Sequence, residues 1–286
     1  MSEKLKVAVI GAGTMGNGIV QVFADFGHQV TMVDMADAAL ERGVASVSKS
    51  LARFVKKEKK TQQEVDQILA RISTSTDLEA AVSDVNLVVE AVFENEEVKK
   101  DLFRRMDGAA LADAILASNT SSISITKIAN VTKRPDKVIG MHFMNPVPLM
   151  KLVEIIKGEL TSDETVAQTI AWSEGLGKVV GLAADYPGFI ANRILMPMIN
   201  EAAFALMEGV GTRESIDTVL KFGCNFPMGP LTLADFIGLD ICVNILDVMH
   251  EGLGDPKYRC CPLLRRMVEA GKLGVKSGQG FYDHSR

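Results

Sequence analysis

A glycine-rich turn between two short apolar runs constrains the fold of this chain more than any other feature. Residues 6–10 form a β-branched run that ends at Gly11, and the turn continues through Gly13 and Gly16. Apolar residues then recur at helical spacing as far as Gly27, and residues 29–33 form a second apolar run. Strand, glycine turn, helix and strand in this order predict a βαβ unit with parallel strands.

The three glycines have distinct expected roles. The first permits the tight turn, the second lets the backbone approach a pyrophosphate, and the third lets the helix pack closely on the strand. Phosphate oxygens would bind the amides at the helix N-terminus, near Thr14 and Met15. A glycine triplet alone is weak evidence and can be no more than a flexible turn, but here a strand precedes it and a helix follows it. We therefore predict a dinucleotide site.

Asp34, at the end of the second apolar run, indicates which dinucleotide binds. Its carboxylate would accept hydrogen bonds from the adenosine ribose hydroxyls and would repel a 2′-phosphate. No arginine directly follows it. The pattern favours NAD over NADP.

Further apolar runs at residues 86–90, 114–117, 137–140, 150–156 and 178–183 alternate with helical stretches. This alternation predicts an α/β fold with a Rossmann-like, doubly wound parallel sheet. The long polar region between residues 36 and 72 has helical periodicity, and we expect a helical hairpin that projects from the sheet. Residues 185–188 interrupt the pattern, and the chain beyond them is typical of helices. We expect domains at 1–186 and 187–286, the second all-α.

Composition excludes several classes of function. The chain has 286 residues and a formal net charge of −5, which argues against general affinity for nucleic acid or anionic membranes. No window approaches about 18 uninterrupted apolar residues, and the N-terminus has no signal-peptide pattern. The four cysteines lack metal-ligand spacing. We expect a cytoplasmic protein with reduced thiols and no metal site.

His142 and Glu154 are the candidate proton-transfer residues. His142 is predicted to lie just past a strand end, where ligands gather in open α/β sheets. A histidine beside a strand is more often structural. However, a turn at residues 147–148 could return the chain so that Glu154, with apolar neighbours on both sides, lies buried alongside the imidazole. The carboxylate would fix the tautomer and stabilise the charged ring, as acid/base catalysis of alcohol oxidation requires.

Two polar segments could complete the site. Residues 118–122 (Ser-Asn-Thr-Ser-Ser) follow another predicted strand, and a helix cap would explain only one of these five residues. They suit hydrogen bonding to a carbonyl, an alcohol or the nicotinamide ribose. Asn192 opens the first helix of the second domain, where alone it would most often be a capping residue.

These motifs resemble the L-3-hydroxyacyl-CoA dehydrogenase family, most closely its bacterial members that act on 3-hydroxybutyryl-CoA. The likeness spans nearly the whole chain, and its most specific motifs are His-Phe-Met-Asn-Pro from His142, Lys-Leu-Val-Glu from Lys151, Pro-Gly-Phe-Ile-Ala-Asn-Arg from Pro187 and Lys-Ser-Gly-Gln-Gly-Phe-Tyr from Lys276. The usual Phe-Phe-Asn-Pro is here Phe-Met-Asn-Pro, a conservative change.

The resemblance implies roles for individual residues. His142 is the general acid/base, Glu154 its partner, and Ser121 and Asn192 hold the reacting oxygens of the substrate. Coenzyme A contacts fall on Ser50 and on Lys57, although Lys56 is an open alternative. The cofactor contacts implied, beyond the glycine loop, are Asp34, Glu94, Lys99, Ser121, Asn145 and Lys276.

We therefore expect an NAD-dependent dehydrogenase that interconverts (S)-3-hydroxyacyl-CoA and 3-oxoacyl-CoA, with the acyl chain between its domains. Two alternatives stay open: a related dehydrogenase of a free hydroxy or sugar acid, and a non-catalytic, crystallin-like dinucleotide-binding relative. A homodimer is also expected from the resemblance, through helices near residues 190–207 and 215–222. The preferred acyl length and the physiological direction are not predicted.

Overall fold

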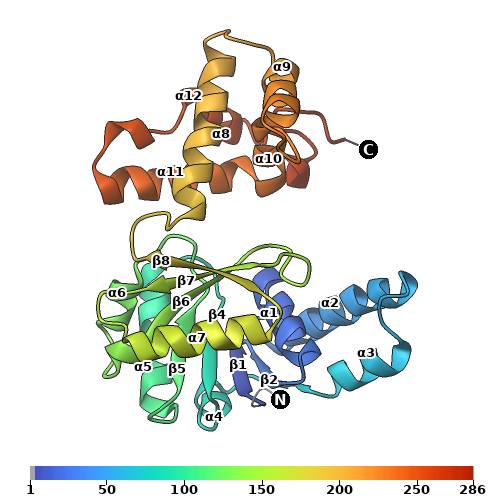
Figure 1. Cartoon of the computed structure of the whole chain (residues 1–286), viewed down its shortest axis with the longest axis vertical. Helices are drawn as coiled ribbons and strands as arrows, with labels where there is room; N and C mark the ends of the chain where they lie inside the picture. Colours follow the sequence, from blue (N-terminus) through green and yellow to red (C-terminus); the bar gives the residue numbers. More distant parts are fainter. Residues whose placement is uncertain (1–3, 286) are drawn as a thin grey trace. The chain divides into compact units, whose positions relative to one another are not determined.

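The computed structural model describes residues 4–285 and divides the chain into two compact units, Met1–Asp185 and Tyr186–Arg286. The first unit is built on one eight-stranded sheet of order β3-β2-β1-β4-β5-β6-β7-β8. Figure 1 shows this sheet with helices around it. The strands are β1 (Lys6–Ile10), β2 (Gln29–Val33), β3 (Ile72–Ser75), β4 (Leu87–Glu90), β5 (Ile115–Ser118), β6 (Val138–Phe143), β7 (Leu152–Lys157) and β8 (Val179–Ala184).

All neighbouring strands pair in parallel except β6 and β7, which are antiparallel. The Rossmann-like fold predicted from the alternating pattern is confirmed, with this one antiparallel pair. Strand β3 was not predicted. It has the sequence Ile-Ser-Thr-Ser and lies at the sheet edge, half-buried or exposed, so it lacks the apolar run that marked the other strands.

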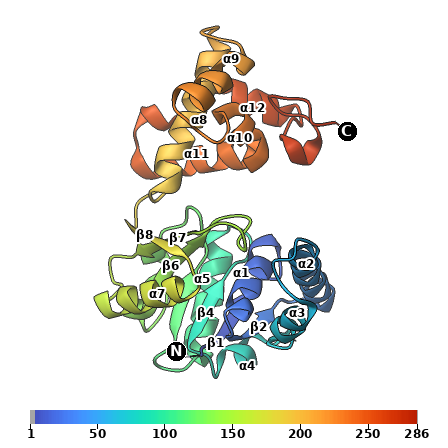
Figure 2. The ribbon, with the colours of Figure 1, turned by 45° about the vertical axis from the view of Figure 1, so that its right-hand side comes forward.

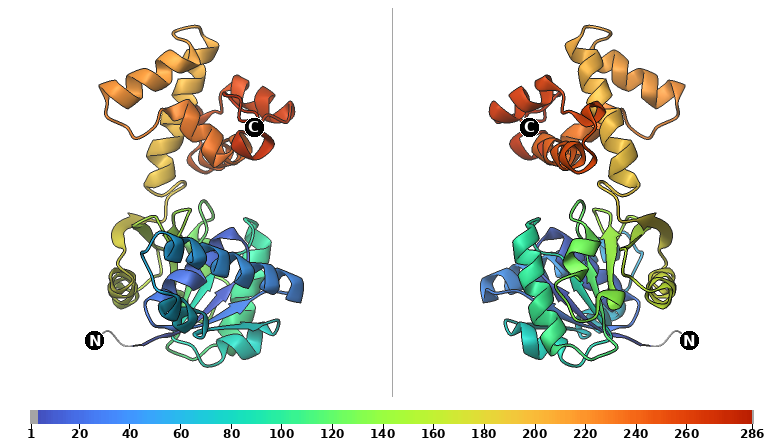
Figure 3. Two further views of the ribbon diagram at one scale, coloured as in Figure 1. Left: turned by 90° about the vertical axis from the view of Figure 1, so that its right-hand side faces the viewer. Right: turned by 90° about the vertical axis from the view of Figure 1, so that its left-hand side faces the viewer.

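Helices cover both faces of the sheet (Figure 3). Helices α1 (Thr14–Asp25) and α7 (Asp163–Gly175) pack on one face, where Phe23 and Val166 join side chains of β1, β6 and β7 in one apolar core. The other face is covered by α4 (Leu78–Val82), α5 (Glu96–Ala109) and α6 (Ile125–Ala129). Side chains of alternate strand residues therefore point to different helical layers.

The polar region after β2 folds as the predicted helical hairpin, α2 (Asp37–Lys56) and α3 (Gln62–Leu69), seen beside α1 in Figure 2. Leu40, Val47 and Leu51 lie on the buried stripe of α2, while charged residues such as Glu41 and Lys49 are exposed. Thr61 and Glu64 form a capping box that starts α3. The lysine-rich segment expected at the hairpin thus lies at the turn between two helices.

The second unit is helical, as predicted, in the residues that the structure describes. Its apolar core joins the longest helices with residues near the C-terminus, among them Met196, Leu246 and Phe281. Its elements are α8 (Ala191–Met207), α9 (Arg213–Thr218), a π-helical turn η2 (Val219–Gly223), α10 (Pro230–Ile237), α11 (Leu239–Leu253), α12 (Pro262–Glu269) and the 3₁₀ turns η3 (Pro256–Tyr258) and η4 (Val275–Ser277); the first unit contains η1 (Pro135–Lys137).

Candidate active site

The glycine loop between β1 and α1 has the geometry that the three glycines predict. Gly11 has φ +107°, and a Cβ there would lie 2.7 Å from the carbonyl oxygen of Ala91, so only glycine fits. At Gly16 a Cβ would lie 1.8 Å from the carbonyl oxygen of Gly11, which shows how closely the helix approaches the loop. At Gly13, the N-cap of α1, a Cβ would meet nothing within 4 Å. The loop therefore presents open backbone beside a helix N-terminus.

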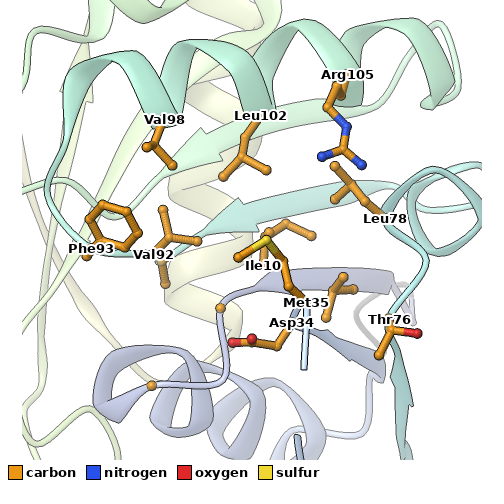
Figure 4. Close-up of a pocket in the computed structure, with 14 residues that line it drawn as sticks. Ile10, Asp34, Met35, Thr76, Leu78, Val92, Phe93, Val98, Leu102 and Arg105 are labelled. Carbon is orange, nitrogen blue, oxygen red and sulfur yellow. The ribbon is translucent and has the colours of Figure 1, made fainter. Parts of the chain in front are cut away.

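Asp34 lies directly beside this loop. Its Oδ2 accepts a hydrogen bond from the amide of Ala12 at 2.9 Å, so the carboxylate also braces the glycine turn. A cavity of about 310 Å³ lies here, and Gly11, Gly13 and Asp34 are among the residues that line it. Figure 4 shows Asp34 and Met35 on one side of it and Val98, Leu102 and Arg105 of α5 opposite. An apolar slot that ends at a carboxylate and a glycine loop fits a nucleoside joined to a pyrophosphate.

His142 and Glu154 face each other across β6 and β7. They are directly paired in the antiparallel register, and Nδ1 of His142 lies 2.8 Å from Oε2 of Glu154. Both residues are buried, with exposed fractions of 7% and 2%. The carboxylate thus orients the ring, and Nε2 is the nitrogen that can exchange a proton with a substrate.

The prediction that His142 lies just past the strand end is wrong. Strand β6 continues to Phe143, because β7 returns antiparallel and extends the backbone pairing beyond Gly140, the last residue that pairs with β5. The expected return of the chain through residues 147–148 and the expected burial of Glu154 are confirmed.

A buried polar cluster joins the ends of β4 and β5 to α5. Glu90 is fully buried. Its carboxylate accepts hydrogen bonds from Lys99 Nζ at 2.6 Å, Ser118 Oγ at 2.6 Å and the amide of Val92 at 2.7 Å. Lys99 is only 1% exposed. The predicted cofactor residue Lys99 therefore lies within a satisfied internal ion pair.

Glu94 organises the segment after β5. Its Oε1 accepts hydrogen bonds from Thr120 Oγ1, Ser122 Oγ and the amides of Ser121 and Ser122, at 2.5 to 3.0 Å. Its Oε2 lies 3.4 Å from Lys99 Nζ. Burial opposes ionisation, but the Lys99 charge and these hydrogen bonds hold the pKa of the Glu94 carboxyl below its usual value. Glu94 and the predicted residue Ser121 are thus brought together.

Most polar side chains of residues 118–122 bond within the protein. Ser118 binds Glu90, and Thr120 and Ser122 bind Glu94. Asn119 accepts a hydrogen bond from the amide of Phe143 at 2.9 Å and so fixes the end of β6. The hydroxyls of Ser118, Thr120 and Ser122 thus donate to carboxylates inside the protein, and their expected bonds to a ligand stay a prediction. The cap of α6 is the next serine, Ser124.

The other predicted residues are spread over both units. Ser50 is half-buried on α2, Lys57 is exposed at its C-cap beside exposed Lys56, and Asn145 is exposed two residues after β6. In the second unit Asn192 is 8% exposed near the start of α8. Also in that unit, Lys276 Nζ lies 2.6 Å from Asp240. Within the first unit, Asp34 lies beside the glycine loop. The hydrogen-bonded clusters around Glu90 and Glu94 lie at the ends of the neighbouring strands β4 and β5.

Sequence reasoning missed Glu90 and Lys178. Glu90 was visible as a carboxylate in an otherwise apolar strand, which is a signal for a buried partner. Lys178, whose ammonium donates hydrogen bonds to the backbone carbonyls of Val147 and Met150, gave no such signal, because backbone partners leave no mark in the sequence. Among residues 4–285 no group of three or more His, Cys, Asp or Glu side chains could hold a metal ion. No helix in that part of the chain is long and apolar enough to cross a membrane.

Comparison with known proteins identifies two matching family models. The model described as "3-hydroxyacyl-CoA dehydrogenase, NAD binding domain" matches residues 6–185, and its "C-terminal domain" matches residues 188–284.

Relatives match over almost the full length. A probable 3-hydroxybutyryl-CoA dehydrogenase of Bacillus subtilis is 53% identical over 99% of this chain and 98% of its own. The mitochondrial hydroxyacyl-coenzyme A dehydrogenase of Homo sapiens is 43% identical over 97% of this chain and 90% of its own. The crystal structure of (S)-3-hydroxybutyryl-CoA dehydrogenase from Ralstonia eutropha has a TM-score of 0.96 and 50% identity, over 99% of this chain and 100% of that one.

Proposed function

The chain belongs to the 3-hydroxyacyl-CoA dehydrogenase family, and from this premise we propose that it interconverts (S)-3-hydroxybutyryl-CoA and acetoacetyl-CoA. It is an NAD-dependent oxidoreductase. The observation that supports the proposed chemistry best is the buried His142–Glu154 pair in the sheet that also carries the glycine loop.

The residues of the first unit fit NAD. Gly13 leaves open space where a pyrophosphate would approach the backbone, and Asp34 stands where ribose hydroxyls would follow. Asp34 also places a negative charge beside the position of a 2′-phosphate, which favours NAD. When bound, the nicotinamide ring supplies the acceptor or donor of a hydride.

His142 exchanges the proton. In oxidation its Nε2 accepts the proton of the substrate hydroxyl, and in reduction the imidazolium returns it. Glu154, hydrogen-bonded to Nδ1, keeps the ring oriented and stabilises its positive charge. We assign Ser121 and Asn192 to the substrate oxygens, because both match the family's residues. Glu94 supports this assignment for Ser121, since it holds the Ser121 amide at 2.9 Å.

The helical hairpin is the proposed site for coenzyme A. Lys56, Lys57 and Lys59 are exposed around the end of α2, on a protein whose net charge is −5. Ammonium groups of this kind attract phosphate oxygens. Ser50 and Lys57 are the assigned contacts, with Lys56 as the alternative at one residue's difference.

The test is steady-state oxidation of NADH with acetoacetyl-CoA, with free acetoacetate and with NADPH in parallel. We expect turnover with the thioester, much lower kcat/KM for the free acid, and preference for NADH. Equal kcat/KM for the free acid would favour a dehydrogenase of free hydroxy acids. Tight NADH binding without turnover would favour a non-catalytic relative.

We further propose a cytoplasmic homodimer. Thiols stay reduced in the cytosol, and the four cysteines are unpaired. Ile194 on α8 and Val219 and Phe222 on η2 are more than half exposed, so the helices expected at the interface present apolar side chains. Sedimentation equilibrium should give twice the chain mass of 30.9 kDa. A monomer at micromolar concentration would contradict the dimer, and cell fractionation tests the location.

A further inference from the structure

Lys178 is a buried cation that the proposed chemistry does not use. It lies just before β8, is 9% exposed, and its ammonium donates hydrogen bonds to the carbonyl oxygens of Val147 at 2.6 Å and Met150 at 2.7 Å. Within residues 4–285 no carboxylate forms an ion pair with it. Burial lowers the pKa of its amine. Because a buried ammonium without a carboxylate is costly, a neutral side chain would be the simpler way to fill this space.

The two carbonyls belong to the turn that joins β6 to β7. Within this turn the amides of Leu149 and Met150 both donate to the carbonyl oxygen of Pro146, at 2.9 and 3.0 Å. The turn begins beside Asn145 and connects the strand of His142 to the strand of Glu154. Through these two hydrogen bonds Lys178 therefore holds the segment that links His142 to Glu154 along the chain.

The turn also packs on the helix that follows the glycine loop. Val147 is 2% exposed, and a Cβ added to Gly18 of α1 would lie 2.9 Å from the Cβ of Val147. The missing side chain of Gly18 thus lets α1 and the turn approach closely. The turn therefore has two fixed contacts, one with α1 through Val147 and one with the Lys178 ammonium.

We propose that Lys178 is a positioning residue for the reaction. By holding the Val147 and Met150 carbonyls it keeps the turn packed on α1 through Val147. It thereby fixes the positions of His142, Glu154 and Asn145 relative to the glycine loop. Lys178 itself touches neither substrate nor cofactor. The inference rests on the proposed function, because it concerns the alignment of that site.

The first test is Lys178→Met, which keeps the length of the side chain and removes its donors. We expect kcat to fall about 10–100-fold, because small misplacements of reacting groups cost this much. KM for acetoacetyl-CoA should stay within about twofold, since the proposed coenzyme A contacts lie on α2. Lys178→Arg retains donors and should recover part of kcat. Lys133→Met, which removes an exposed lysine of the same unit, should behave as wild type.

A second variant displaces the turn at its contact with α1. Gly18→Ala would push on Val147, and we expect the same fall in kcat with nearly unchanged KM for the acyl-CoA. This variant keeps the proposal testable if Lys178→Met does not fold. Agreement between variants at two separate contacts of the turn would support positioning, and a normal kcat in Gly18→Ala would oppose it.

Hydrogen exchange of the protein without ligands provides a readout independent of turnover. In Lys178→Met the amides of Leu149 and Met150 should exchange faster, while core amides of β1 and β4 stay protected. If Lys178→Met lowers thermal stability but leaves kcat and these amides unchanged at the assay temperature, Lys178 is only structural and the proposal fails. Absence of wild-type turnover would overturn the proposed function instead, and the exchange result would still decide whether the clamp exists.

Discussion

The glycine loop and the His142–Glu154 pair lie in one sheet but are built in opposite ways. The loop follows a parallel strand and offers backbone, since Gly13 leaves open space around its Cα. The pair lies inside two antiparallel strands and offers side chains that are buried against each other. We therefore expect recognition of the dinucleotide to depend on backbone conformation, and the proposed proton transfer to depend on strand register.

This difference predicts that the two regions fail separately. A change in the loop should weaken cofactor binding and leave the acid/base pair intact, while a change in the pair should stop turnover and leave cofactor binding intact. The two regions meet in the turn between β6 and β7, which packs on α1 through Val147.

The largest expected effect comes from His142→Gln. Without the proton-transfer group kcat should fall about 10²–10⁴-fold. The dissociation constant of NADH, measured by fluorescence titration, should stay near the wild-type value because the loop is untouched. His250→Gln, at an exposed position of α11, serves as the control. Full activity in His142→Gln would remove this residue from the mechanism.

Gly13→Ala should disrupt cofactor binding at the glycine loop. A Cβ at this position meets no protein atom within 4 Å, so the melting temperature of the ligand-free protein should hardly change. The added methyl would occupy the space assigned to the pyrophosphate, and overpacking there should weaken NADH binding on the order of tenfold to a hundredfold. Unaltered NADH affinity in calorimetry would show that the dinucleotide does not approach Gly13.

Asp34→Ala tests the role of the carboxylate beside the glycine loop in the choice between NADH and NADPH. Removing the carboxylate takes away both a ribose acceptor and a charge that repels a 2′-phosphate, so the ratio of kcat/KM for NADH over NADPH should fall on the order of tenfold. Because Asp34 also accepts the Ala12 amide, NADH affinity should weaken too. The control is Glu41→Gln, an exposed acidic residue of α2. An unchanged cofactor ratio would contradict the role of Asp34.

The smallest effect concerns His28, a second buried histidine, which lies in the cofactor-binding half. Its Nδ1 accepts the amide of Leu5 at 3.0 Å, and burial lowers its pKa from 6.5. The folded protein therefore binds fewer protons here than the unfolded chain, and stability should fall as pH drops below 6.5. For one proton the slope is at most about 1.4 kcal/mol per pH unit.

His28→Asn keeps an acceptor for Leu5 but does not titrate. Urea unfolding at pH 5 and pH 8 should show a smaller pH dependence in this variant than in wild type. Equal pH dependence would mean that other groups dominate the acid response. His142 contrasts with His28, because its Nδ1 faces a carboxylate rather than a backbone amide.

Much of this architecture could be predicted from local sequence. The βαβ unit, the hairpin α2–α3 and the helical second unit follow from apolar periodicity, because that pattern records which faces are buried. The roles predicted for Gly11 and Gly16 follow from the absence of a Cβ, which permits close backbone approach. Strand β3 could not be predicted in this way, since its polar sequence forms a strand only by pairing with β2.

The hydrogen bonds that polar residues form inside the protein were harder to predict from the sequence. The hydroxyls of Ser118, Thr120 and Ser122 looked available to a ligand, but Glu90 and Glu94 bind them. The carboxylates and these hydroxyls lie 26 to 28 positions apart in the chain, and the parallel pairing of β4 with β5 brings them together. A polar side chain in a sequence shows what it can bind, and its neighbours in space decide what it does bind.

The sequence by itself determined the family and the dinucleotide loop, and it suggested the proposed acid/base pair, because these depend on residue type at local spacing. Tertiary structure decided that His142 lies inside a strand and that its Nδ1 faces Glu154. It also decided that Lys178 binds the turn between the strands of His142 and Glu154. These facts depend on the antiparallel return of β7 and on the crossover to β8. Contacts between distant segments are set by packing of the whole sheet, which local patterns do not encode.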